Sequence, residues 1–207
     1  MSAAPTIGLF GGSFDPPHLG HLALARQARD QLALDEVRWL PAGQPWQKAH
    51  RVLAPAADRA AMVVLMIEGE RGMLLDERET RRAGPSYTID TVDELRAERP
   101  GAALVLVVGQ DQYAGLPTWH RWRDLVDAVT LAVAGRAGEA PRPAPELAAR
   151  PHRVVVLAMP PVPVSSTAVR AAAAAGADLH ALVGPAVAGY IARRGLYRTP
   201  SPSPTRS

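Results

Sequence analysis

Short apolar runs alternate with segments of helical periodicity along most of this 207-residue chain. The clearest run covers residues 104–108, Leu-Val-Leu-Val-Val, and ends at Gly109. A run of this kind is typical of a strand that is buried on both faces of a parallel sheet. Strands that alternate with helices imply right-handed crossover connections. The sequence therefore predicts an α/β fold of the Rossmann-like, doubly wound type, with a mostly parallel sheet and helices on both of its faces.

The same patterns divide the rest of the chain into elements. Ser86 is expected to cap one helix, and Gly176 to end another that contains the alanine-rich residues 171–175. We expect a single domain over residues 1–198, of which 164–198 form a small C-terminal helical part. The remaining expectations are strands at 6–10, 36–41, 74–75, 130–134 and 153–157, helices at 19–34, 58–70 and 86–99, an exposed connector at 135–151 and a disordered tail at 199–207.

Composition narrows the class of protein further. Hydrophobic residues make up 47% of the chain and charged residues 21%, a balance that can bury a core. The chain has no cysteine, which excludes disulfides and thiolate metal sites. It has no membrane-spanning apolar run and no secretory signal pattern at its start, so a cytoplasmic location is expected. A net charge of +3 is too small to indicate nucleic-acid binding, although a locally positive cleft for phosphates is compatible with it.

The most informative stretch is Gly-Gly-Ser-Phe-Asp-Pro-Pro-His-Leu-Gly-His, residues 11–21, between the first expected strand and the first expected helix. Gly11 and Gly12 permit a tight turn and a close approach of the backbone to a ligand. His18 and His21 are three residues apart at the helix start, where the unpaired amides already attract anions. The stretch therefore predicts a phosphate site. An incidental glycine turn is the plainer alternative, and a metal site is disfavoured because no further ligands cluster nearby.

A second loop near the other end of the chain has related properties. Residues 164–170 read Val-Ser-Ser-Thr-Ala-Val-Arg and lead into the alanine-rich helix. Ser165 or Ser166 can cap that helix, and Arg170 lies one turn further, where its guanidinium can reach the same anion. Taken alone, the pattern is more typical of an ordinary capped helix with a solvated arginine. Together with residues 11–21 it predicts that the two loops converge on one triphosphate.

These two loops resemble the HxGH and SSTxxR motifs of the nucleotidylyltransferase superfamily, which contact nucleotide phosphates. The middle of the chain is similar to the bacterial nicotinate-nucleotide adenylyltransferase family, through Arg-Ala-Gly-Pro-Ser-Tyr-Thr-Ile-Asp-Thr at residues 82–91, Gly-Gln-Asp at 109–111, and Trp119. The resemblance covers residues 7–197. It implies transfer of AMP from ATP to nicotinate mononucleotide. It also implies that Asp111 contacts the adenosine ribose, and that Thr88 and Trp119 contact the nicotinate.

Physical chemistry agrees with this resemblance. Thr88 lies at an expected helix start, where free amides suit a carboxylate better than a neutral carboxamide. Trp119 offers an aromatic face to the pyridinium cation. Taken singly, Thr88 could equally be a capping residue, and Trp119 a core aromatic. Asp111 follows a buried strand and a glycine, a position that is more often functional than structural.

Two segments raise separate questions. Residues 41–48, Pro-Ala-Gly-Gln-Pro-Trp-Gln-Lys, depart from the Pro-Pro-His-Lys stretch that the family often shows. Lys48 could still serve phosphates, but the roles of Trp46, Lys48 and His50 stay open. The run Asp-Glu-Arg-Glu at residues 76–79 is expected to be a charged surface segment rather than a pair of catalytic carboxylates.

The expected chemistry is in-line attack by the acceptor phosphate on the α-phosphorus of ATP, without a covalent enzyme intermediate. Mg²⁺ is expected to arrive with ATP, held mainly by phosphate oxygens and water. The residues expected to act in catalysis are His18, His21 and Arg170. Those expected to bind ATP are Gly11, Ser13, Phe14, His18, Gly20, His21, Gly109, Asp111, Ser165, Ser166, Thr167 and Arg170. Those expected to bind nicotinate mononucleotide are Gly12, Ser13, Lys48, Ser86, Tyr87, Thr88, Trp119 and His120.

Other functions remain open on the sequence alone. The acceptor could be nicotinamide mononucleotide, phosphopantetheine or a flavin, since enzymes for these share the first motif. A non-catalytic nucleotide sensor on the same fold is disfavoured, because it would not need His18, His21 and Arg170. No nucleic-acid or membrane partner is expected, and a homo-oligomer is compatible with the sequence.

Overall fold

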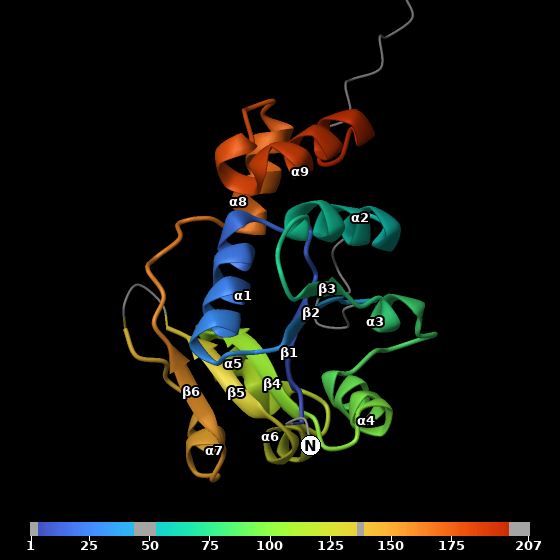
Figure 1. The fold of residues 1–207 in the computed structure, drawn as a ribbon. Coiled ribbons are helices and arrows are strands. Elements are labelled where there is room, and N and C mark those ends of the chain that lie inside the picture. The colour runs from blue at the N-terminus through green and yellow to red at the C-terminus, as the bar shows by residue number, and fades with distance from the viewer. Residues whose placement is uncertain (1–3, 44–52, 136–138, 199–207) are drawn as a thin grey trace, which may run out of the picture.

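The computed structural model describes residues 4–43, 53–135 and 139–198 (Figure 1). In this part of the chain the strands form one six-stranded sheet, in the order β3-β2-β1-β4-β5-β6, and every neighbouring pair is parallel. The order reverses between β1 and β4, which confirms the doubly wound α/β fold. The strands are β1 (Thr6–Gly12), β2 (Glu36–Pro41), β3 (Met73–Leu75), β4 (Ala103–Gly109), β5 (Thr130–Ala134) and β6 (Val154–Leu157).

Helices connect the strands and cover both faces of the sheet (Figure 1). On α1, Leu22, Ala25 and Ala28 are buried at helical spacing, which turns one stripe of the helix toward the core. The helices are α1 (Leu19–Gln31), α2 (Ala56–Ile67), α3 (Arg78–Arg81), α4 (Thr88–Glu98), α5 (Gln110–Gly115), a 3₁₀ helix (Leu116–Thr118), α6 (Trp122–Ala128), α7 (Pro145–Ala148), α8 (Ser166–Ala174) and α9 (His180–Arg194).

The central strand β4 shows why its sequence is continuously apolar. Val105 and Val107 pack into the core cluster shared with α1, α2, α8 and α9. Leu104, Leu106 and Val108 point to the opposite face and pack into the cluster shared with α4 and α6. Since successive side chains of a strand alternate between faces, a strand covered on both sides requires apolar residues at every position.

Several element boundaries differ from the expectations. Ser86 is not a helix cap, because α4 begins at Thr88 and its N-cap residue is Tyr87. The segment 135–151 is not only an exposed connector, since α7 forms within it and Leu147 is fully buried. Gly176 ends α8 as expected, with a φ of 70° that favours glycine. The predicted disordered tail at 199–207 lies outside the described residues.

The helices α8 and α9 lie beyond the carboxyl ends of the strands, at the top of Figure 1. There α9 packs against α2. The carboxylate of Asp58 on α2 is buried and accepts hydrogen bonds from the Tyr190 hydroxyl (2.7 Å) and from Nε of Arg194 (3.0 Å). The C-terminal helices are therefore anchored to the main body at the edge of the sheet where ligands of α/β proteins bind. None of the described helices is long and apolar enough to cross a membrane.

Candidate active site

A cavity of about 350 Å³ opens where the strand order reverses, at the carboxyl ends of β1 and β4. This is the position at which open α/β sheets bind their ligands. Its walls come from the loop after β1, the start of α1, the end of β4, the segments before α4 and α6, and the first residue of α8. The lining residues are Phe10, Gly11, Gly12, Ser13, His21, Leu24, Leu40, Ala42, Glu79, Ser86, Tyr87, Thr88, Leu106, Val107, Val108, Gly109, Gln112, Trp119, His120 and Ser166.

The two histidines of the first loop cap helix α1 reciprocally. Nδ1 of His18 accepts a hydrogen bond from the backbone N–H of His21 (3.3 Å), and Nδ1 of His21 accepts one from the backbone N–H of His18 (3.1 Å). The two rings stack with their centroids 3.6 Å apart. Because Nδ1 is an acceptor in both rings, the proton of each neutral imidazole is assigned to Nε2. The cap thus sets the tautomer as well as the orientation of both side chains.

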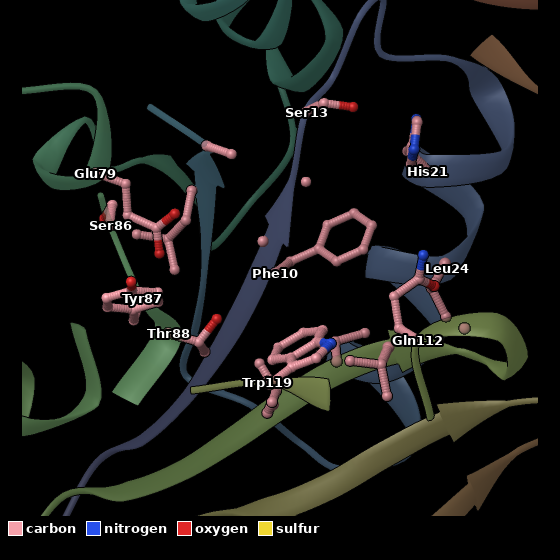
Figure 2. A pocket seen from close by; sticks show the side chains of 18 of the residues that line it. Phe10, Ser13, His21, Leu24, Glu79, Ser86, Tyr87, Thr88, Gln112 and Trp119 are labelled. Atoms are coloured by element: carbon pink, nitrogen blue, oxygen red, sulfur yellow. The ribbon is translucent and has the colours of Figure 1, made fainter. Parts of the chain in front are cut away.

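The histidines differ in their surroundings. His18 is buried, and loss of solvation lowers its pKa from 6.5 to about 4. It is therefore neutral at pH 7 and does not neutralise phosphate charge as a cation. His21 lines the cavity, where Figure 2 shows its ring on the same side as Ser13. The structure thus brings His21 to the ligand space and places His18 behind it.

The closing loop meets the first loop as the sequence predicts. Ser165 caps α8 by accepting a hydrogen bond from the backbone N–H of Ala168 (3.2 Å). The Ser166 hydroxyl donates to the carbonyl oxygen of Pro16 (2.9 Å), 150 positions away in the sequence. Arg170 donates to the carbonyl oxygen of Asp15 (2.5 Å) and to the hydroxyl of its own neighbour on α8, Thr167 (2.8 Å). The guanidinium is therefore held against the first loop rather than solvated.

A buried carboxylate, Asp15, extends this junction to the residues that follow α9. It is 1% exposed, and its Oδ1 accepts hydrogen bonds from the backbone N–H of Ala54 (3.1 Å) and from the Tyr197 hydroxyl (2.8 Å). Burial, together with the neighbouring negative charge, raises the pKa of Tyr197, so the hydroxyl keeps its proton and remains a donor. With the backbone carbonyl that accepts from Arg170, Asp15 therefore ties three separate segments to the loop that precedes α1.

Arg59 on α2 also holds the loop after β1 in place, through hydrogen bonds. Its guanidinium is buried and donates to the carbonyl oxygens of Ser13 (2.9 Å), Gly43 (3.3 Å) and Ala54 (3.0 Å). A charged group that satisfies three backbone carbonyls fixes their relative positions, since each would otherwise lose a hydrogen bond in a buried place. The loops after β1 and β2 are held together by this one side chain.

The opposite wall of the cavity carries the residues expected to bind the acceptor. Figure 2 shows Ser86, Tyr87 and Thr88 along one side and Trp119 below them, across the cavity from Ser13 and His21. The rings of Tyr87 and His120 lie with their centroids 4.2 Å apart. The N-cap residue Tyr87 makes no side-chain hydrogen bond to the first amides of α4. A helix start of this kind favours an anion.

The cytidylyltransferase-like family matches residues 9–172 of this chain. A probable nicotinate-nucleotide adenylyltransferase from Methylibium petroleiphilum is 56% identical over 206 residues, covering 97% of each chain. Another from Laribacter hongkongensis is 48% identical and covers 95% of this chain and 96% of the relative. The chain belongs to the nicotinate-nucleotide adenylyltransferase family. The fold is shared with a Plasmodium falciparum nicotinic acid mononucleotide adenylyltransferase complexed with NaAD, at a TM-score of 0.79, 16% identity and coverage of 93% and 97% of the two chains.

In this adenylyltransferase family member, the predicted residues divide into those at the cavity and those behind it. The predicted residues that line the cavity are Gly11, Gly12, Ser13, His21, Ser86, Tyr87, Thr88, Gly109, Trp119, His120 and Ser166. Those outside its lining are Phe14, His18, Gly20, Asp111, Ser165, Thr167 and Arg170. Lys48, Trp46 and His50 lie outside the described residues, so the structure leaves the altered loop open.

Two predicted ATP-binding residues have other neighbours in the structure. Phe14 is buried in the core and packs edge-on against the His21 ring, with centroids 5.2 Å apart. At Gly20 a Cβ atom would lie 3.0 Å from a methyl group of Val164 and 3.1 Å from Nδ1 of His18. Gly20 therefore allows the closing loop to approach α1, which is a packing reason for glycine at this position.

Asp111 is exposed in the first turn of α5, just after Gly109 at the cavity wall.

The expectation of a charged surface run at residues 76–79 is wrong. Asp76 pairs with Arg78 (2.9 Å) and Arg38 (3.2 Å), and all of these side chains are largely covered. Glu79 is 7% exposed and lines the cavity. Burial raises its pKa to about 7, although the hydroxyl of Thr91 donates to its Oε1 (3.1 Å) and opposes that rise. Sequence reasoning missed Glu79 because its burial comes from the packing of α3 against β2 and α4.

Other missed lining residues are the apolar floor of the cavity and Gln112. Phe10, Leu40 and Leu106 lie on strands, so the strand assignments together with the switch-point rule could have found them. Across the described ranges, no group of three or more His, Asp or Glu side chains could hold a metal ion.

Proposed function

We propose that the protein transfers AMP from ATP to nicotinate mononucleotide, forming nicotinate adenine dinucleotide and releasing pyrophosphate. The observation that carries the proposal is the junction of two loops from opposite ends of the chain at one cavity. Ser166 and Arg170 hydrogen-bond to the loop that presents His21. Membership of the nicotinate-nucleotide adenylyltransferase family supports the same activity.

On the phosphate side, the chemistry needs alignment and neutralisation of charge rather than an activated nucleophile. The acceptor phosphate is already a nucleophile at neutral pH, and it attacks the α-phosphorus of ATP in line with the departing pyrophosphate. His21 donates from Nε2 to the reacting phosphates, while His18 holds the His21 backbone through the reciprocal cap. Arg170 supplies positive charge at the same junction. Preorganised donors of this kind stabilise the transition state without reorganising.

Mg²⁺ enters this scheme as part of the nucleotide substrate. A hard divalent cation prefers phosphate oxygens and water, and usually keeps several of its waters. The chain would then act on the phosphates through N–H donors of His21, Arg170 and the backbone amides at the starts of α1 and α8. The predicted ATP-binding set, including Asp111 for the ribose, remains part of this proposal.

On the acceptor side, selection of nicotinate over nicotinamide would arise at the start of α4. A carboxylate there receives charge-assisted hydrogen bonds, each stabilising by about 1.5–3 kcal/mol. That range corresponds to roughly ten- to a hundredfold discrimination against the neutral amide. Trp119 at the base of this wall offers its face to the pyridinium ring.

The deciding experiment is an acceptor panel. Pyrophosphate release from ATP is measured with nicotinate mononucleotide, nicotinamide mononucleotide, phosphopantetheine and a flavin mononucleotide in parallel. We expect turnover with the nicotinate compound, weaker turnover with the nicotinamide compound and none with the other two. Preference for any other acceptor would refute the assignment. ATP binding by calorimetry without turnover on any acceptor would indicate a nucleotide sensor instead.

A further inference from the structure

The cavity wall that faces the expected acceptor carries a carboxyl group. Among the lining residues in the described part of the chain, Glu79 is the one Asp or Glu. Figure 2 shows its side chain on the same side of the cavity as Ser86 and Tyr87. An ionised carboxylate there would repel the carboxylate of nicotinate and would accept a hydrogen bond from the amide of nicotinamide. Its presence therefore conflicts with acid selection unless the group is protonated when the acid binds.

The groups around Glu79 do little to hold it in the ionised form. Thr91 on α4 donates one hydroxyl to Oε1, at 3.1 Å. The guanidinium of Arg82, between α3 and α4, also favours the ionised form, but it is paired with Glu94 at 2.7 Å. The carboxylates of Asp76, after β3, and of Glu94, on α4, add like charge. At the start of α4, the ring of Tyr87 and the neighbouring ring of His120 complete the titratable groups of this wall.

We propose that Glu79 is a specificity-determining residue of the acceptor site, and that its protonated carboxyl group admits the nicotinate carboxylate whereas its ionised form disfavours it. The inference rests on the proposed function, and it makes Glu79 and the protonation state of its carboxyl group part of acceptor selection. In the protonated form Glu79 presents an O–H donor, which matches the carboxylate of the acid. In the ionised form it presents only acceptors, which match the N–H₂ group of the amide.

The sign of the pH dependence follows from the surroundings. Burial raises the pKa of Glu79 to about 7, so the free enzyme is mostly protonated at pH 6 and mostly ionised at pH 8. The protonated fraction falls about tenfold over that interval. Preference for the acid over the amide should therefore fall by about tenfold from pH 6 to pH 8, and binding of the acid at pH 8 should take up nearly one proton.

The test compares the ratio of kcat/KM for nicotinate mononucleotide to that for nicotinamide mononucleotide at pH 6, 7 and 8. Ionisations that affect both acceptors equally, such as those of ATP and of the acceptor phosphates, cancel in this ratio. We expect the ratio to fall with pH in the unaltered protein and to stay high and flat in Glu79→Gln, whose amide donates at every pH. The matched control is Glu77→Gln, since Glu77 lies outside the cavity lining and pairs with Arg81 at 2.9 Å.

A second measurement uses only the unaltered protein, so it decides the matter even if Glu79→Gln folds poorly. Binding of each mononucleotide is followed by calorimetry at pH 8 in two buffers of different ionisation enthalpy. We expect proton uptake with the acid and none beyond the shared phosphate contribution with the amide. Equal proton uptake for the two acceptors, or a selectivity ratio that does not change with pH, would overturn the role of Glu79. No turnover of nicotinate mononucleotide at any pH would instead overturn the proposed function.

Discussion

On the side of the cavity that carries His21, most hydrogen bonds join side chains to backbone groups of the loops after β1 and β2. On the side that carries Glu79, they join side chains of α3, α4 and the residues between these helices to one another. The first side is a scaffold of backbone atoms, suited to phosphates that have the same shape in every nucleotide. The second depends on side chains and on their protonation, which suits the recognition of one particular acceptor.

The largest effect is expected from breaking the phosphate side at His21. Replacement by Ala removes the Nε2 donor, and loss of one preorganised donor typically lowers turnover by about 10²–10³-fold. Steady-state kinetics with both substrates at saturation measures the change in kcat. A loss of less than about fivefold would remove His21 from the catalytic set, and a proportionate rise in both KM values would indicate a general loosening of the loop.

A change at His18 tests the phosphate side through the free energy of unfolding rather than through turnover. Its pKa is lowered from 6.5 to about 4 in the fold, so the unfolded chain binds the proton more readily between these values. The stability contributed by neutral His18 is present above pH 6.5 and is lost as the pH falls toward 4, to the extent of about 3 kcal/mol.

Urea unfolding at pH 7, 5 and 4 measures this loss against the variant His18→Asn. Asn can cap the helix through its side-chain oxygen but has no proton to gain in this range. The free energy of unfolding should fall more steeply with acid in the unaltered protein than in the variant. Parallel curves would show that His18 carries its charge in the folded state.

A change at Trp119 tests whether the acceptor side of the cavity binds the mononucleotide independently of ATP. Its replacement by Ala removes an aromatic face worth about 1–2 kcal/mol to a desolvated cation, so the KM for the mononucleotide should rise by about five- to thirtyfold. The KM for ATP should stay nearly unchanged. Trp122→Phe serves as the control, because Trp122 packs in the core and does not line the cavity. An equal rise in both KM values for Trp119→Ala would contradict the division of the cavity into two sides.

The smallest effect is expected from Tyr197→Phe, which removes one hydrogen bond to Asp15. The free energy of unfolding should fall by about 1 kcal/mol. Because Asp15 belongs to the loop that presents His21, the KM for ATP should rise by a few-fold as well. Tyr190→Phe is the matched control, since its hydroxyl binds Asp58 away from that loop. If both variants lost stability alone, Tyr197 would have no part in shaping the phosphate side.

The phosphate side could be predicted from the sequence because its information is local. The glycines, histidines and capping serines of the two loops are contiguous, and each follows an apolar run that identifies a strand. The strands at 36–41 and 130–134 were predicted at their observed bounds for the same reason. The convergence of the loops followed from the rule that parallel strands end at one edge of the sheet.

The residues that sequence reasoning missed have partners far away in the chain. Arg59 lies in an apolar helix, and its role depends on three backbone carbonyls that belong to the loops after β1 and β2. Glu79 lies in a charged run that is locally indistinguishable from a solvated one. The helix α7 was missed because it is a single short turn, held by the burial of Leu147. In each case the decisive term is tertiary contact, which has no periodicity to detect.

The junction between Asp15 and the last described residues has a consequence for biosynthesis of the protein. Ser166, Arg170 and Tyr197 leave the ribosome long after the loop that they brace. A polypeptide that stops before these residues can form the early strands, but it lacks the side chains that hold the loop after β1 in place for nucleotide binding. Catalytic competence would therefore arise only after residue 170 has been synthesised, so that a product truncated before that point would consume no ATP.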